Sequence, residues 1–102
     1  MLKRVDIQEK FKFLLGSNNV YYQPPANLKM KYPAIVYSLD GLDVKRFDNT
    51  RLINKNCFSV THIYRNESEN LVETMLKNFE YISFDNRSIV DGIYNDHYTI
   101  YW

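Results

Sequence analysis

The segment Lys55-Asn56-Cys57-Phe58-Ser59-Val60-Thr61-His62-Ile63-Tyr64 contains the clearest structural signal in this chain of 102 residues. Its residues alternate in character with a period of two, which is typical of a β-strand whose two faces meet different surroundings. One face would carry Phe58, Val60, His62 and Tyr64, and the other Cys57, Ser59, Thr61 and Ile63. The segment 55–64 is therefore predicted to be a strand.

Two other segments have helical spacing. In residues 3–15 the apolar side chains that share one face are Ile7, Phe11, Leu14 and Leu15. Gly16 is predicted to end this helix, because glycine readily adopts the left-handed conformation found there. A second helix is expected after Asn66, an N-cap residue with Glu69 as its reciprocal partner. Its expected buried stripe is Val72, Met75, Leu76 and Phe79, with Leu71 beside it.

Further strands are predicted at 20–22, 32–39, 81–84 and 96–102, and residues 88–91 form either a strand or an extended link. Pro24 and Pro25 cannot donate to a strand ladder and therefore end the first of these strands or place it at an edge. The run 34–37 is apolar on both faces, which predicts a strand covered on both sides. Asp85 and Asn86 are expected to end the strand 81–84.

The order helix, strands, helix, strands predicts an α+β fold, a mixed and mostly antiparallel sheet with two helices packed on one face. The length favours a single domain spanning 1–102. The charged stretch at about 42–54 is interpreted as a projecting arm. The sheet face opposite the helices is expected to carry aromatic side chains that another chain would cover.

Aromatic residues are abundant, with nine tyrosines, six phenylalanines and one tryptophan. A domain of this size has little interior volume, so some of these rings are expected on surfaces that contact other molecules, where Tyr, Trp and Phe are enriched. The alternative is that the tyrosines simply lie on strands with their hydroxyl groups in water.

The net charge of +1 gives no overall field that would attract nucleic acid or an anionic membrane. The apolar runs are too short for a membrane span, and the first residues lack the apolar core of a secretion signal. The single cysteine agrees with a reducing cytoplasm as the place of synthesis. No membrane partner is therefore expected.

No catalytic or cofactor-binding set is recognisable. Cys57 and His62 fall on opposite faces of their strand, so a shared metal ion is not expected, and His62 is interpreted as a packed or hydrogen-bonded histidine. The acids Asp40, Asp43 and Asp48 are interpreted as solvated turn residues. The chain is thus expected not to be an enzyme and to bind no cofactor or metal. Binding of single-stranded nucleic acid stays open as an alternative, through the basic residues Lys29, Lys31, Lys45, Arg46, Arg51 and Lys55.

Several different short motifs occur along the chain in a recognisable order. They are Val20-Tyr21-Tyr22-Gln23-Pro24-Pro25, Met30-Lys31-Tyr32-Pro33-Ala34-Ile35-Val36-Tyr37, Asp48-Asn49, Val60-Thr61, Arg65-Asn66-Glu67-Ser68-Glu69, Ser83-Phe84-Asp85 and Tyr98-Thr99-Ile100-Tyr101. In this order and spacing the chain resembles the tail-terminator, or tail-completion (head–tail joining), proteins of long-tailed bacteriophages.

This resemblance implies a structural virion protein of the phage neck, assembled in the host cytoplasm. Such proteins form a ring, commonly of six copies, at the head-proximal end of the tail. The ring ends polymerisation of the tail tube protein and joins the tail to the head–tail connector proteins. The alternatives are a connector-side adaptor of the neck and a non-viral cytoplasmic module that binds a protein or a single strand.

Ring formation would need contacts between different faces of neighbouring copies, for which strand edges are suitable. The strand 20–22 with its Pro-Pro loop and the C-terminal strand are the expected edges. The predicted subunit interface is Tyr21, Tyr22, Pro24, Pro25, Tyr98, Tyr101 and Trp102. In the arm, Lys45, Arg46 and Arg51 would either face the ring lumen and contact passing DNA without sequence preference or lie at a solvated hairpin tip.

Overall fold

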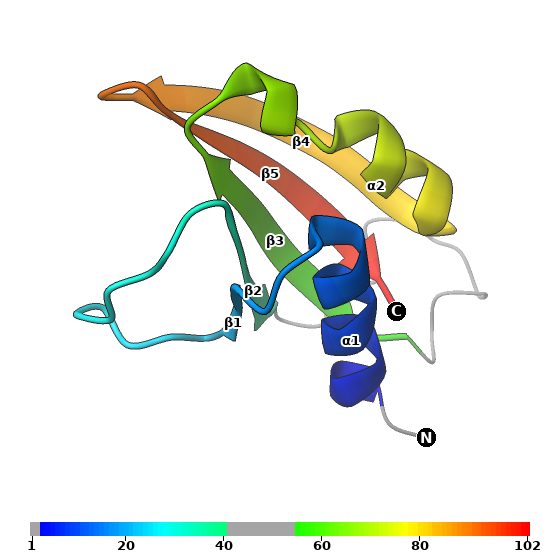
Figure 1. Ribbon diagram of the computed structural model, residues 1–102. Helices are drawn as coiled ribbons and strands as arrows, with labels where there is room; N and C mark the ends of the chain where they lie inside the picture. Colours follow the sequence, from blue (N-terminus) through cyan, green and yellow to red (C-terminus); the bar gives the residue numbers. More distant parts are fainter. Residues whose placement is uncertain (1–2, 41–54) are drawn as a thin grey trace.

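The structure is a computed structural model that describes residues 3–40 and 55–102. Its elements follow one another as α1 (Lys3–Leu15), β1 (Val20–Tyr22), β2 (Ala34–Leu39), β3 (Cys57–Tyr64), the 3-10 helix η3 (Glu67–Glu69), α2 (Val72–Asn78), β4 (Tyr81–Val90) and β5 (Ile93–Tyr101) (Figure 1). The predicted arm at 42–54 lies outside the described residues.

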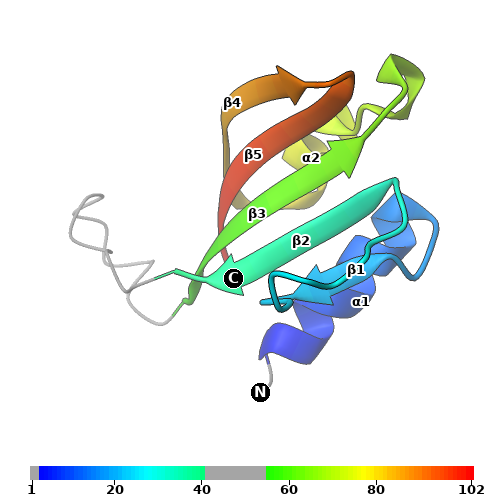
Figure 2. The ribbon, with the colours of Figure 1, turned by 90° about the vertical axis from the view of Figure 1, so that its left-hand side faces the viewer.

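The described strands form a five-stranded sheet in the order β1-β2-β3-β5-β4. β1 pairs with β2 in parallel, and the other three pairs are antiparallel. Both α-helices of the described chain lie on the same side of this sheet, so the view in Figure 2 shows the sheet in front and the helices behind it. The predicted α+β fold, with a mixed and mostly antiparallel sheet and two helices on one face, is confirmed.

The predicted alternation along β3 is confirmed. Phe58, Val60, His62 and Tyr64 are all buried on the helix side. The first two join the main core, where α1 contributes Ile7 and Phe11. α1 ends as expected, because Gly16 has a φ of 80° and its amide donates to the carbonyl of Lys12 at 2.9 Å.

The second helix is shorter than predicted. The capping box of Asn66 and Glu69 is present, but it caps the short helix η3. The chain then leaves helical geometry at Asn70, whose Oδ1 accepts from the amide of Val72 at 2.7 Å where α2 begins. In α2 the buried side chain is Met75, and its neighbour Leu76 is 44% exposed. The prediction that Leu76 is buried was wrong, because consecutive residues point about 100° apart around a helix.

The C-terminal half holds a longer hairpin than predicted. Asp85 does not end a strand. It occupies a register shift between Phe84 and Asn86, so β4 continues to Val90. Asp91 and Gly92, with φ values of 52° and 77°, then make the tight turn into β5. β5 consequently begins at Ile93 rather than at the predicted residue 96.

The sheet face turned away from the helices differs from expectation. β2 begins at Ala34, since Pro33 has no amide proton for the ladder, and no helix of the described chain covers this face of β2. A row of hydroxyl side chains crosses the face at Ser38, Ser59, Thr99 and Ser83. The middle of this face is therefore polar. The aromatic side chains that the face does carry are Tyr21 on β1, Tyr81 on β4 and Tyr101 on β5; the first two are half-buried and Tyr101 is buried.

Candidate functional site

The C-terminal strand is an interior strand and not an edge. β5 pairs with β3 on one side and with β4 on the other. Tyr98 packs into the main core and Tyr101 packs with Cys57 and Tyr81, so the two are only 1% and 6% exposed. The prediction that these two tyrosines belong to a subunit interface was wrong, because the order of the strands places them inside the subunit.

The remaining predicted interface residues are more accessible. Tyr22 is half-buried against Tyr37, with ring centroids 4.9 Å apart. Tyr21 is half-buried and its hydroxyl oxygen accepts from the amide of Lys31 at 3.4 Å. Pro24 is half-buried and Pro25 is exposed. These four residues lie together at the β1 edge of the sheet. The predicted lumen residues Lys45, Arg46 and Arg51 lie outside the described residues.

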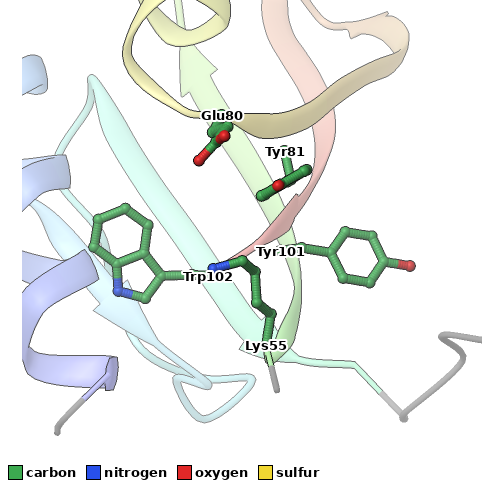
Figure 3. Close-up of a pocket in the computed structure, with 5 residues that line it drawn as sticks. All are labelled: Lys55, Glu80, Tyr81, Tyr101 and Trp102. Atoms are coloured by element: carbon green, nitrogen blue, oxygen red, sulfur yellow. The ribbon is translucent and has the colours of Figure 1, made fainter. Parts of the chain in front are cut away.

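Trp102 lies at the opposite end of the sheet from the turn between β4 and β5. Its ring meets Phe79 edge-on at 5.7 Å, and Lys10 Nζ lies 5.1 Å from its centroid. Trp102 also borders a surface pocket of about 240 Å³, whose other lining residues are Lys55, Glu80, Tyr81 and Tyr101 (Figure 3).

This pocket is small for a ligand site. Its volume lies below the range of roughly 300 to 1,000 Å³ that is usual for small-molecule sites. In Figure 3 the side chain of Lys55 extends between the rings of Tyr101 and Trp102, which point in opposite directions, and its Nζ lies 5.4 Å from the ring centroid of Tyr81.

A buried carboxylate joins β3, β4 and β5. Asp96 is fully buried, and its two oxygens accept from Arg87 Nε at 2.6 Å and Arg87 Nη2 at 3.0 Å. The hydroxyl of Tyr64 donates to the same carboxylate at 2.7 Å, and the Tyr64 ring stacks on Tyr94 at 5.0 Å. The hydrogen bond to Asp96 raises the pKa of Arg87, and burial raises the pKa of Tyr64. Since its charge is balanced and both oxygens are bonded, Asp96 is a structural group.

His62 lies directly opposite Asp96 on the neighbouring strand. It is fully buried and stacks on Tyr64 at 4.5 Å, and neither ring nitrogen has a hydrogen-bond partner among the described residues. Burial lowers the pKa of His62 to about 4, against the opposing attraction of Asp96. His62 is therefore neutral near pH 7, and its interpretation as a packed histidine is confirmed.

Other chemical groups are sparse in the described part of the chain. Cys57 is buried on the other face of β3. Residues 3–40 and 55–102 contain no group of three or more His, Cys, Asp or Glu side chains placed to hold a metal ion. Within the same residues, no helix has the length and apolar character needed to cross a membrane.

The most exposed strand is β4, which forms one edge of the described sheet. Residues 83–90 are all exposed, and they include Ile89 at 56% and Val90 at 59%. Sequence reasoning missed this surface because it divided β4 at Asp85. The dipeptide Asp91-Gly92, a typical hairpin turn, is the signal that would have indicated it.

The two edges of the sheet differ in charge. The segment 66–92, which includes β4, contains six acidic and two basic residues. One of those two bases, Arg87, is bonded to the buried Asp96. The segment 16–39, which includes β1 and β2, contains Lys29 and Lys31 and no acidic residue. Three of the six acids, Glu80, Asp85 and Asp91, lie on β4 or directly beside it, so the β4 edge is acidic, and the β1 edge is basic through Lys29 and Lys31 of the loop that follows β1.

Comparisons of this chain with protein-family models, with curated proteins and with solved structures gave no match.

Proposed function

We propose that this protein is a structural subunit of a phage tail, one copy of a homo-oligomeric ring of the tail-terminator type. The exposed edge strand β4 is the observation that carries this proposal. The ring would lie at the head-proximal end of the tail, end polymerisation of the tail tube and join the tail to the head connector. These partners follow from the resemblance of the sequence motifs to that family.

The β4 edge has the properties of a surface that a partner covers. Monomeric proteins blunt exposed edges with short strands, prolines, lysines or bulges. β4 is ten residues long and contains no proline or lysine. Its bulge and Asp85 protect its first half, but in its second half Ile89 and Val90 remain exposed. An edge of this kind favours association with another chain.

The difference between the two edges favours a ring. A symmetric dimer uses the same patch on both copies, whereas a ring uses two different patches on each copy. The acidic β4 edge and the basic β1 edge are two such patches within one sheet. A contact between unlike edges repeats from copy to copy until it closes.

The proposal is tested by comparing phage particles assembled with and without this protein. Tails that grow beyond their normal length in its absence are expected, because nothing would then cap the tube. Tails of normal length that fail to join heads would contradict a terminator and favour a connector-side adaptor. Normal, infectious particles would contradict both.

A further inference from the structure

We infer that neighbouring copies in the ring meet through one contact, in which the acidic β4 edge of one copy lies against the basic β1 edge of the next. This inference rests on the proposed ring. The partner at each edge is a second copy of this chain. Three properties of the two edges support the contact: their charge, the direction of their strands and their position along the strand axis.

Charge provides the first support. Around β4 the acidic side chains Glu80, Asp85 and Asp91 are all exposed. On the loop 23–33 that follows β1, Lys29 and Lys31 are exposed. Opposite charges across an interface guide association and disfavour wrong pairings, here an acidic edge on another acidic edge.

Strand direction provides the second support. β1 runs parallel to β2, and each of the steps from β2 to β3, β3 to β5 and β5 to β4 is antiparallel. β1 and β4 therefore run in opposite directions. If the ring axis lies along the strands, rotation about it brings the β1 edge of the next copy antiparallel to β4, the geometry of an added antiparallel strand.

The level of the two edges along the strands agrees. One row across the sheet is Tyr22, Tyr37, Val60, Tyr98 and Phe84, and the next is Tyr21, Val36, Thr61, His97 and Asn86. Rotation without a shift along the axis thus places β1 of the next copy beside residues 84–87. From there its loop 23–33 returns toward the row that contains Ala34 and Ser88, which brings Lys29 and Lys31 toward the Asp91 end of β4.

Exposed apolar side chains accompany the charges. Leu28 is exposed on the loop, and Ile89 and Val90 are exposed at the end of β4. The same arrangement would cover them together. Burial of these side chains would contribute to the free energy of association without being screened by salt. The attraction between the charged edges, in contrast, is screened by salt.

Substitutions that change the charge of each edge test the contact, with self-association of the full chain measured by sedimentation. The loop variant carries Lys29→Glu and Lys31→Glu, and the edge variant carries Asn86→Lys and Ser88→Lys at exposed β4 positions. Each is expected to weaken association on the order of 100-fold, because each places like charges in contact. Combining all four substitutions is expected to recover most of the lost affinity, since the charges on the two edges are then opposite again.

The matched control for the loop variant is Lys12→Glu with Lys77→Glu, which makes the same change in net charge on the helices away from both edges. It is expected to associate like the wild type. Rings that persist in both the loop variant and the edge variant would overturn this contact without contradicting the proposed ring. A wild-type protein that stays monomeric at every concentration would overturn the ring itself.

Cross-linking tests the same contact without altering charge. Tyr21→Cys combined with Asn86→Cys places one thiol on each edge in a shared row, and oxidation is expected to give a ladder of covalent oligomers. Tyr21→Cys combined with Ser59→Cys is the control, because Ser59 is exposed in the middle of the same face. Equal ladders from both pairs, or no ladder from the first, would overturn the inference.

Discussion

The two halves of the sheet are stabilised by different interactions. Beneath α1 the core is aromatic. The ring centroid of Tyr37 lies 5.2 Å from that of Phe11 and 5.7 Å from that of Phe58. On the β4 side the strands are joined by one buried carboxylate, Asp96, which binds Arg87 and Tyr64. Apolar packing continues under α2, where Met75 and Phe79 join Tyr98 and Ile100 in the core, and the bonds of Asp96 are added to it near the turn between β4 and β5.

This difference explains where a partner surface can form. Apolar packing under α1 requires both layers to remain closed, so in that half only the β1 edge and the loop 23–33 are available to a partner. The directed bonds around Asp96 hold β4 and β5 in register while leaving residues 83–90 exposed. The long exposed edge of the described sheet therefore lies on β4, at the far side of the sheet from α1.

The largest effect is expected in the aromatic half. Phe11→Ala should destabilise the fold by about 3 to 5 kcal/mol, because it removes a fully buried ring and leaves a cavity. Denaturant unfolding measures this loss. Phe13→Ala is the matched control on the same helix, since Phe13 is 82% exposed and its loss should change stability by less than about 0.5 kcal/mol. Equal losses in the two variants would contradict the assigned core.

A slightly smaller effect is expected at the carboxylate of the other half. Asp96→Ala should cost about 3 kcal/mol, because it leaves the Arg87 guanidinium and the Tyr64 hydroxyl without their acceptor. Asp85→Ala is the control, because Asp85 accepts from Ser83 and Thr99 hydroxyls at the exposed bulge. Stability that falls no further in Asp96→Ala than in this control would show that the buried bonds are unimportant.

Acid is expected to destabilise the fold through protonation of His62. Its folded-state pKa of about 4 lies below its ordinary value of 6.5, so the unfolded chain binds the proton more readily. The contribution of neutral His62 is complete above pH 6.5 and should be lost as the pH falls toward 4, by about 2 to 3 kcal/mol.

His62→Phe keeps an aromatic ring beside Tyr64 and cannot take up a proton. It should therefore show a shallower loss of stability over the same pH range, and at pH 7 it should match or exceed the wild type, because it removes two buried nitrogens without partners. Unfolding measured at several pH values compares the two proteins. Parallel curves would exclude His62 as the source of the acid sensitivity.

The smallest effect on the monomer is expected at the exposed end of β4. Ile89→Ser with Val90→Ser should change monomer stability by less than about 1 kcal/mol, since both side chains are more than half exposed. Self-association should nevertheless weaken. Leu76→Ser, at an exposed site on α2, is the control and should associate normally. Unchanged association in the β4 variant would remove these two side chains from the interface.

Local patterns in the sequence predict much of this fold. The alternation in 57–64 identified β3 and its buried face, and the apolar spacing with Gly16 identified α1 and its end. The capping box at Asn66 was also real, but the length of the helix after it depends on what the chain packs against. Such signals are reliable where neighbouring residues alone decide the conformation.

The order of strands is not a local property, and the candidate interface depends on it. β5 lies between β3 and β4, and its Tyr98 and Tyr101 are buried, although from the sequence both were expected at a subunit interface on an edge strand. The bulge at Asp85 likewise exists because β4 pairs with β5 on both sides of it. The β4 edge therefore became visible only once the pairing of distant segments was known.

Amide hydrogen exchange of β4, followed as the protein concentration rises, tests the central claim most directly. If the edge is covered by another copy, exchange in residues 83–90 should slow in step with the increase in mass from monomer to ring, while the buried amides of β3 stay unchanged. Exchange in 83–90 that stays fast while the mass increases would show that copies associate through another surface and would contradict this account.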